Sequence, residues 1–495
     1  MQTNQPCKTG LDFLFCIEIQ QFIITKLLSD QAVAAPPSGI INDSQPTGIK
    51  TTSTPSAKKD DNVVKLDIDK LPVRVQRIVV DGLTRTKDDI VIKEIKPLLN
   101  AKTFDELVHL SYNAKVKMER LGLFKNVVIA IDVSKDNKEY GYEVLFEVQE
   151  FRRVDGGIHT SISNNDGSLD FQLKMPNILG RGERFSLDYT VGTKRTHGYS
   201  AYFKKPLNNN PDIFLGSTAY QFHGEYPWSG YKQTDRGVAF DLTFPTILGS
   251  HNIQWEGVWR DLRALARDTS FSVREQAGHS LKSSLKHTFT IDTRDDPILP
   301  TVGVLWRTSQ EYAGLGGNVE FAKQDGMFQW NTSLPLDAIF QMSLAGGLMR
   351  TLDPNTSVSI SDRFFLGGPL TLRGFNLKGC GPHSYDNALG GESYWLAAAH
   401  LYSPLPFRPG KGRFGELFKT HLFLNAGNLG NLDFNNLSTS FQDFAASLRW
   451  SFGCGVVLCM GRIARLELNY VVPMRVQKGD KANPGLQFGI GIQFL

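Results

Sequence analysis

The sequence predicts a mainly β protein: a transmembrane antiparallel β-barrel of about 16 strands, preceded by a small α+β domain. Short runs of alternating apolar and polar residues recur from residue 151 onward, separated by Gly, Pro, Asn or Asp. Glycine (46 residues) and phenylalanine (32 residues) are both frequent, which is typical of tight strand turns and aromatic girdles. Between residues 71 and 150, by contrast, helical and strand periodicities alternate.

The composition excludes several other classes. Hydrophobic residues make up 41% of the 495 residues, and no run of about 18 apolar residues occurs, so a helical membrane span is not expected. The formal net charge of +4 is too small for this length to indicate a nucleic-acid partner. The five cysteines are scattered and form neither a metal-ligand pattern nor a dense disulfide framework. We therefore expect no cofactor, no metal and no nucleic acid.

Residues 1–70 are predicted to be a disordered N-terminal segment. The apolar stretch at 11–28 is interrupted by acidic and amide residues, and only one cation precedes it, so a cleaved secretory signal is not expected. Residues 32–62 are rich in Ala, Pro, Ser, Thr and Asn, and they carry too few large apolar groups to bury a core.

Residues 71–150 are predicted to form a small domain with the element order β-α-α-β-β. Residues 73–80 read as a strand, a first helix follows, and a second helix is expected at about 105–121. Residues 127–133 and 142–148 alternate apolar with polar side chains and are predicted strands.

Residues 151–495 are predicted to form the barrel. In 281–292, leucine, phenylalanine and isoleucine share one face, while lysine, serine and threonine share the other. A soluble sandwich also alternates in this way. Charges on the polar faces and strands of about ten residues or more favour a barrel that crosses a membrane around a wet lumen. At roughly 20 residues per strand and turn there is room for roughly 16–17 strands, and the tendency to even numbers selects about 16.

A long Gly- and Pro-rich interruption of the barrel, at about 353–390, contains an arginine motif. A buried cation inside a barrel is costly unless it is paired with an acid. The candidate counter-ions on predicted lumen faces are Glu392, Asp443 and Glu467, with Asp443 placed on the same strand face as Arg449. The residues alone leave the choice among these acids open, and they also allow a solvated outer loop without a pair. The motif consists of Leu372, Arg373, Gly374 and Phe375.

This stretch resembles a known family. Residues 363–375 (RFFLGGPLTLRGF), followed by 390–395 and 400–407, are similar to the arginine loop of the outer-membrane protein insertases, above all the mitochondrial sorting and assembly machinery core subunits. The resemblance implies that the loop folds back into the barrel lumen, where its arginine meets an acid of the inner wall. Residues 121–126 (LGLFKN) resemble the closing turn of a POTRA domain, which implies that 71–150 is one such domain.

The last strand carries a second resemblance. It fits the pattern polar-x-Gly-x-x-apolar-x-apolar, which is similar to the sorting signal of mitochondrial barrel precursors. Glycines in this strand and near residues 152–158 weaken strand pairing, so the seam between the first and last strands is a plausible place for the barrel to open. An opened seam is an unpaired edge that can template an incoming strand. The pattern positions are Gln487, Gly489, Ile492 and Phe494.

Together these features predict a core insertase that assembles β-barrel precursors into the mitochondrial outer membrane, with the N-terminal domain in the intermembrane space. The resemblance implies as partners the precursors, outer-membrane lipid, accessory assembly subunits and an inner-membrane organising complex. No nucleophile–base set, phosphate loop or metal cluster is recognisable, so no enzymatic activity is expected. The alternatives are a two-partner-secretion-type polypeptide transporter, a passive outer-membrane porin and a soluble β-protein that binds a lipid or other ligand.

Overall fold

The computed structural model describes residues 71–494, apart from 135–139, 164–165, 209, 354–355, 406–416, 433–435, 462–463 and 492–493. The predicted disordered segment 1–70 lies outside the described residues. Among the described residues, no helix is long and apolar enough to cross a bilayer.

The N-terminal domain has the predicted order β-α-α-β-β, with one short 3₁₀ turn between the helices. Its three strands form a sheet in the order β1-β3-β2, in which β1 is parallel and β2 antiparallel to the central β3. The elements are β1 (Arg74–Asp81), α2 (Asp88–Ile95), η3 (Lys96–Asn100), α3 (Phe104–Leu121), β2 (Phe124–Val133) and β3 (Gly141–Glu150). The proposed domain limits of 71–150 stay a prediction.

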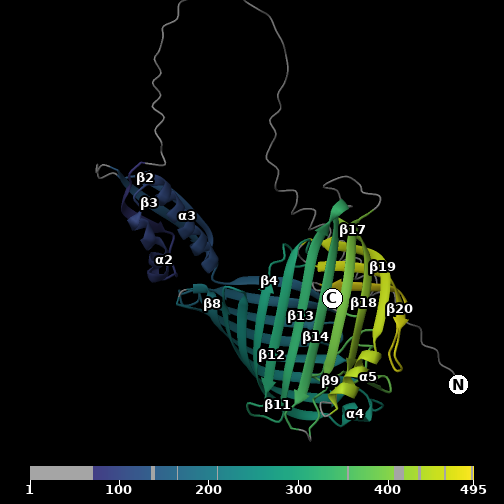
Figure 1. Ribbon diagram of the computed structural model, residues 1–495. Coiled ribbons are helices and arrows are strands. Elements are labelled where there is room, and N and C mark those ends of the chain that lie inside the picture. Colours follow the sequence, from purple (N-terminus) through teal and green to yellow (C-terminus); the bar gives the residue numbers. More distant parts are fainter. Residues whose placement is uncertain are drawn as a thin grey trace, which may run out of the picture. The chain divides into compact units, whose positions relative to one another are not determined.

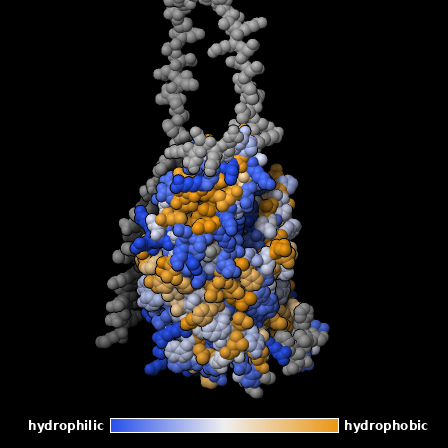
Figure 2. Space-filling model, turned by 90° about the vertical axis from the view of Figure 1, so that its left-hand side faces the viewer, coloured by the Kyte–Doolittle hydropathy of each residue, from blue (hydrophilic) through white to orange (hydrophobic). Residues whose placement is uncertain are grey.

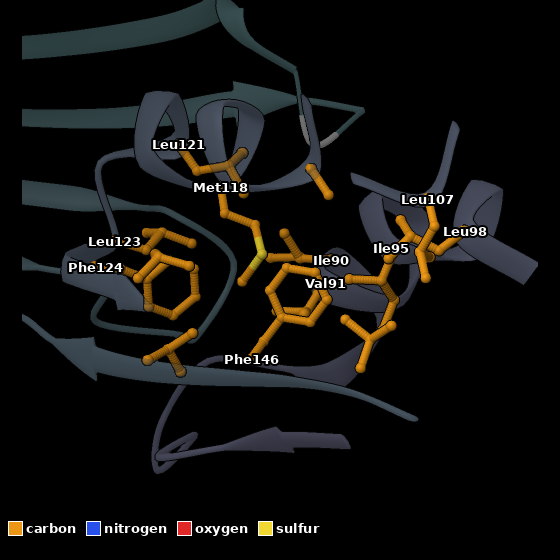
Figure 3. Close-up of a cluster of buried hydrophobic side chains, with 14 of the residues drawn as sticks. Ile90, Val91, Ile95, Leu98, Leu107, Met118, Leu121, Leu123, Phe124 and Phe146 are labelled. Carbon is orange, nitrogen blue, oxygen red and sulfur yellow. The ribbon is translucent and has the colours of Figure 1, made fainter. Parts of the chain in front are cut away.

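The core of this domain lies between the two helices and one face of the sheet (Figure 3). Helix α3 begins where the Thr103 side chain accepts a hydrogen bond from the amide of Glu106, and it ends at Gly122, whose φ of +63° is left-handed. Met118 on α3 and Phe146 on β3 are both fully buried in the cluster. The apolar spacing along α3 therefore both forms the helix and fixes which of its faces meets the sheet.

The remainder is one 16-stranded antiparallel sheet, which confirms the predicted strand number. Each strand pairs with the next strand of this sheet along the chain, and β14 pairs with β17. Figure 1 shows β12, β13, β14, β17 and β18 side by side as long tilted strands. The first eight strands are β4 (Asp155–Ser163), β5 (Asp166–Pro176), β6 (Arg184–Gly192), β7 (His197–Leu207), β8 (Asn210–Tyr226), β9 (Tyr231–Pro245), β10 (Ser250–Ala264) and β11 (Gly278–Asp292). The last eight are β12 (Gly303–Ala313), β13 (Phe321–Leu334), β14 (Ala338–Thr351), β17 (Ser393–Pro404), β18 (Phe418–Gly430), β19 (Arg449–Met460), β20 (Ala464–Arg475) and β21 (Gly485–Gly491).

Short elements occupy the connections between the strands. Two small helices and a 3₁₀ turn lie between strands, and a two-residue ladder lies between β14 and β17. They are α4 (Phe271–Arg274), η4 (Pro335–Asp337), α5 (Leu437–Ala446), β15 (His383–Ser384) and β16 (Asn387–Ala388).

The polarity of the barrel is inverted relative to a water-soluble protein. In β20, Arg465, Glu467 and Asn469 are buried, whereas Leu468 and Tyr470 are 52% and 56% exposed. Apolar side chains also reach the surface on the face shown in Figure 2, between hydrophilic patches. An apolar exterior and a polar interior are what a bilayer-spanning barrel requires, because its outer face meets hydrocarbon.

Glu150, the last residue of β3, organises the junction between the N-terminal domain and the barrel. Its Oε1 accepts hydrogen bonds from the amides of Thr84, Arg85 and Thr86 at 3.2, 3.1 and 2.9 Å. Arg85 also donates to the backbone carbonyl of Pro176, at the end of β5. One carboxylate thus holds a turn that contacts the barrel.

This arrangement predicts acid sensitivity at the junction. Burial raises the pKa of Glu150, but the hydrogen bonds from Thr86, Thr84 and Arg85 outweigh it and lower the pKa from 4.5 to about 2. Because the folded-state pKa is the lower one, the stabilisation is present above pH 4.5 and is lost as the pH falls toward about 2. Hydrogen–deuterium exchange of the amides at 84–86, corrected for intrinsic rates, should therefore accelerate over this range.

Two variants test whether Glu150 causes that pH dependence. Glu150→Gln should give fast exchange at 84–86 already at neutral pH. Glu147→Gln, which changes an exposed acid of the same strand, should behave as the wild type. Protection that is insensitive to both pH and Glu150→Gln would mean that another contact holds the turn.

Candidate functional site

The loop between β14 and β17 (residues 352–392), which we call the lumen loop, is anchored on two distant walls of the barrel. Asp362 of the loop accepts two hydrogen bonds from Arg260 on β10. Arg373, eleven residues further on, contacts Glu467 on β20. Because β10 and β20 are far apart in the strand order, a loop that touches the inward faces of both must cross the barrel interior.

Arg373 forms a buried ion pair with Glu467. Its Nε and Nη2 lie 3.1 and 2.9 Å from Oε2 of Glu467, and neither side chain is exposed to solvent. Glu467 also pairs with Arg465, whose Nε lies 2.8 Å from Oε1, and it accepts a bond from Asn469 Nδ2 at 2.8 Å. One carboxylate therefore lies between two guanidinium groups in a site without water access, where removing it is costly.

The backbone beside Arg373 is fixed to the strands at the end of the barrel. The Gly374 amide donates to Gln487 Oε1 on β21 at 2.9 Å, and Gln487 Nε2 donates back to the carbonyl of Phe375 at 3.2 Å. Ser451 on β19 donates to the carbonyl of Arg373 at 2.6 Å. The motif thus binds β19, β20 and β21 together, next to the seam.

Gly374 is required by both conformation and space. Its φ of +89° lies in the region that favours glycine. A Cβ at this position would lie 3.1 Å from Val471 Cγ1 and 3.3 Å from Ser451 Cβ. The glycine lets the loop backbone approach β19 and β20 closely enough for Arg373 to reach Glu467.

Two phenylalanine rings complete the surroundings of the arginines. The guanidinium carbon of Arg373 lies 5.1 Å from the ring centre of Phe423 and 5.8 Å from that of Phe494. Arg465 lies 4.3 Å from the Phe494 ring. Phe494 belongs to the predicted closing-strand signal, and in this structure its buried ring contacts cations inside the barrel.

The other predicted site residues lie in different surroundings. Leu372 and Phe375 are fully buried in an apolar cluster of the lumen loop. Gln487 contacts the loop as described above. Gly489 lies on β21 beside Pro369, and a Cβ added to this glycine would lie 3.0 Å from the Cβ of Pro369. Glu392 precedes β17, where its backbone bonds to Gly430. Ile492 lies outside the described residues.

The placement of Asp443 on a strand face is wrong. Residues 437–446 form helix α5, and β19 begins only at Arg449. The apolar residues Leu437, Phe441 and Phe444 are spaced by four and three, a helical period that the alternation argument overlooked. The side chain of Asp443 itself lies outside the described residues.

The sequence did not identify the second anchor of the lumen loop. Arg260 Nη1 and Nη2 bind the two oxygens of Asp362 at 2.6 and 3.0 Å, and Lys323 donates to the Asp362 carbonyl at 2.8 Å. Lys282 lies 2.8 Å from Glu311 and 3.2 Å from Glu256 in the same cluster. The available signal was the inward-facing charge on β10, β11 and β13, but nothing in the sequence marks Asp362 as the partner of these residues.

The seam lies between the two edge strands of the sheet. Within the described residues, no backbone ladder joins β4 to β21. Some Cα atoms of the two strands nevertheless approach within 8 Å, so the strands are neighbours. Their facing edges therefore offer backbone donors and acceptors beside the anchored lumen loop.

These features define the class of protein, a 16-stranded membrane barrel of the outer-membrane type that follows an α+β domain. Its lumen loop is anchored to the barrel wall, and no backbone ladder is described between its first and last strands. Comparison with known sequences identifies the family. The Omp85 superfamily domain matches residues 177–494. The sorting and assembly machinery component 50 homolog of Bos taurus is 48% identical over 427 residues, which cover 86% of this chain and 91% of that protein. The Homo sapiens homolog is 47% identical with the same coverage.

The chain therefore belongs to the Omp85 superfamily and, within it, to the family of sorting and assembly machinery component 50 homologues, which confirms the family prediction. Among solved structures, BamA from Haemophilus ducreyi lacking POTRA domains 1–3 matches with a TM-score of 0.69 at 18% identity, covering 84% of each chain. That likeness concerns the fold and agrees with the sheet described above.

Proposed function

We propose that this protein is the membrane-embedded core of a machinery that inserts β-barrel precursors into the mitochondrial outer membrane, acting by strand templating at a lateral gate. Membership of the family supports a role in β-barrel assembly, and neither a polypeptide transporter nor a passive porin is favoured. The observation that carries the mechanism is the seam, where β4 and β21 are neighbours without a described ladder.

The physical reason for templating is the cost of unpaired backbone in hydrocarbon. A precursor strand that enters a bilayer alone exposes amides and carbonyls that find no hydrogen-bond partner there. The edges of β4 and β21 present complementary groups, so a client strand pairs as it leaves water. The polar inner faces can meanwhile contact the side of a client hairpin that will later face its own lumen.

The lumen loop has a bracing role in this proposal. When the seam opens, β21 loses contact with β4, and the end of the sheet needs another support. The bonds of Gly374 and Phe375 to Gln487, of Arg373 to Glu467, and of Ser451 to the loop supply it on three consecutive strands. Opening can then displace one edge while the neighbouring wall keeps its shape.

The remaining parts of the proposal concern surroundings and partners. The N-terminal domain would lie in the intermembrane space, where the edges of its three-stranded sheet, β1 and β2, can accept a partner strand. Expected partners are β-barrel precursors, outer-membrane lipid, accessory assembly subunits and an inner-membrane organising complex.

The test is Arg373→Ala in cells depleted of the endogenous protein. The barrel should remain inserted, because Arg465 still compensates Glu467. Assembly of newly imported barrel precursors, followed on native gels, should slow by about tenfold. That change corresponds to about 1.4 kcal/mol, which is less than the about 3–5 kcal/mol lost when a buried charge is left without any partner.

A matched control separates bracing from a general loss of charge. Arg475→Ala removes an exposed arginine at the end of β20, outside the Arg373 network. It should leave assembly unchanged. Wild-type assembly rates in Arg373→Ala would contradict bracing, and normal precursor assembly after depletion of the whole protein would contradict the proposed function itself.

A further inference from the structure

A groove of about 1140 Å³ lies on the outward face of the strands from β4 to β11. Its floor consists of small side chains that face one another across neighbouring strands. Leu187 on β6 continues the same row. The floor residues are Ala201 on β7, Ala219 on β8, Val238 on β9 and Gly257 on β10.

Larger side chains flank this floor. On one side, beyond the residues that line the groove, Phe240 and Trp255 face each other on β9 and β10, with stacked rings 5.9 Å apart. On the other side, the rings of Tyr189 and Tyr199 stack at 4.8 Å. At roughly 4.8 Å per strand, the floor from Leu187 to Gly257 extends roughly 19 Å across the strands.

One side of the groove carries a cation among its apolar walls. Arg236 lies in register between Gln221 on β8 and Trp259 on β10. Its Nε donates to Gln221 Oε1 at 3.0 Å, and its guanidinium carbon lies 5.1 Å from the Trp259 ring centre. Both partners are neutral, so they orient the guanidinium without neutralising its charge.

Arg236 also lies at a boundary of polarity. The next outward-facing row toward the strand ends is polar, with His223, Thr234 and Asp261 on β8, β9 and β10. The acid of that row, Asp261, lies 2.6 Å from Arg263 and also interacts electrostatically with Arg236, so it is shared between the two arginines. A lipid-facing arginine is tolerated where hydrocarbon gives way to headgroups, and there its N–H groups meet phosphate.

We propose that this groove binds an anionic phospholipid, with one acyl chain on the floor of small side chains and the phosphate on Arg236. Apolar contacts hold the chain, and charge complementarity selects an anionic headgroup over a zwitterionic one. The lipid would occupy the leaflet at the barrel end that carries the connection between β8 and β9. The inference rests on the membrane location of the barrel but not on insertase activity.

Native mass spectrometry of the full chain in detergent micelles tests the proposal, with phosphatidylglycerol or phosphatidylcholine added as probes. The wild type should retain phosphatidylglycerol preferentially. Arg236→Gln should reduce that retention by about tenfold, the loss expected for a charge-assisted phosphate contact. It should have a smaller effect on phosphatidylcholine, because the choline cation already offsets the charge of that lipid's phosphate. Ala219→Phe, which places a large apolar ring on the floor, should reduce retention of both lipids.

Arg195→Gln provides the matched control, because Arg195 lies in the turn after β6 at the same barrel end and pairs with Glu225 at 3.5 Å. It should bind both lipids as the wild type does. Equal retention of the two lipids by the wild type, or an equal loss in Arg195→Gln and Arg236→Gln, would overturn the site. Precursor assembly measured on the same variants keeps this result separate from the proposed function.

Discussion

Replacing Glu467 by glutamine is expected to lower the free energy of unfolding of the barrel by about 3–5 kcal/mol. The substitution keeps the size of the side chain but removes the carboxylate that lies between Arg373 and Arg465, both of which are buried. Two cations then share a site without water access, and glutamine offers a single carbonyl oxygen to both. Denaturant unfolding in detergent micelles, followed by the mobility shift of folded barrels on semi-native gels, measures the change.

The stability of a variant that lacks one of the two arginines tests whether the loss in Glu467→Gln comes from the unpaired cations. Arg373→Met leaves Glu467 paired with Arg465, so it should cost less than Glu467→Gln. Combining the two substitutions should restore part of the stability, because the double variant buries one unpaired cation instead of two. Additive losses in this cycle would show that the pair contributes little, and that the glutamine acts through its other contacts, such as the bond from Asn469.

The sequence could predict the ingredients of this site but not their pairing. Alternation places Glu467 on the inward face of its strand, because side chains of a strand alternate between faces, and the arginine motif is local. The choice of Glu467 over Glu392 depends on where the lumen loop places Arg373 in space. Arg373 and Glu467 are 94 residues apart in the sequence. That placement comes from Gly374, Ser451 and Gln487, whose joint effect no local pattern encodes.

Prediction from the sequence had similar limits elsewhere in the chain. The strand number was predictable from the length of the barrel region, because a strand and its turn take roughly 20 residues and even strand numbers are preferred. Helix α5 was missed because a ten-residue insertion between two strands inherited the period assigned to its neighbours. The Arg260–Asp362 anchor was missed because it joins a strand to an irregular loop over 102 residues, where periodicity gives no information.

A disulfide across the seam is expected to abolish precursor assembly while leaving the barrel inserted. One cysteine at each position from 155 to 160 on β4 can be combined with one cysteine at each position from 485 to 491 on β21, in a background without the native cysteines. Some Cα atoms of the two strands lie within 8 Å of each other, and the scan finds the pair that meets the roughly 4.4–6.8 Å between Cα atoms that a disulfide requires. Oxidation of that pair fixes β4 to β21, so neither edge is free to pair with a client strand.

Thr160 and Leu169, which face each other on β4 and β5, supply the control. A cysteine pair at these positions joins two strands that are already laddered, so its oxidation should not affect assembly. Reduction of the seam disulfide should restore assembly in the same membranes, which distinguishes a closed gate from a damaged barrel. Full assembly activity with an oxidised seam would mean that clients do not pass between β4 and β21, and the templating mechanism would then have to be abandoned even though the fold and the family stand.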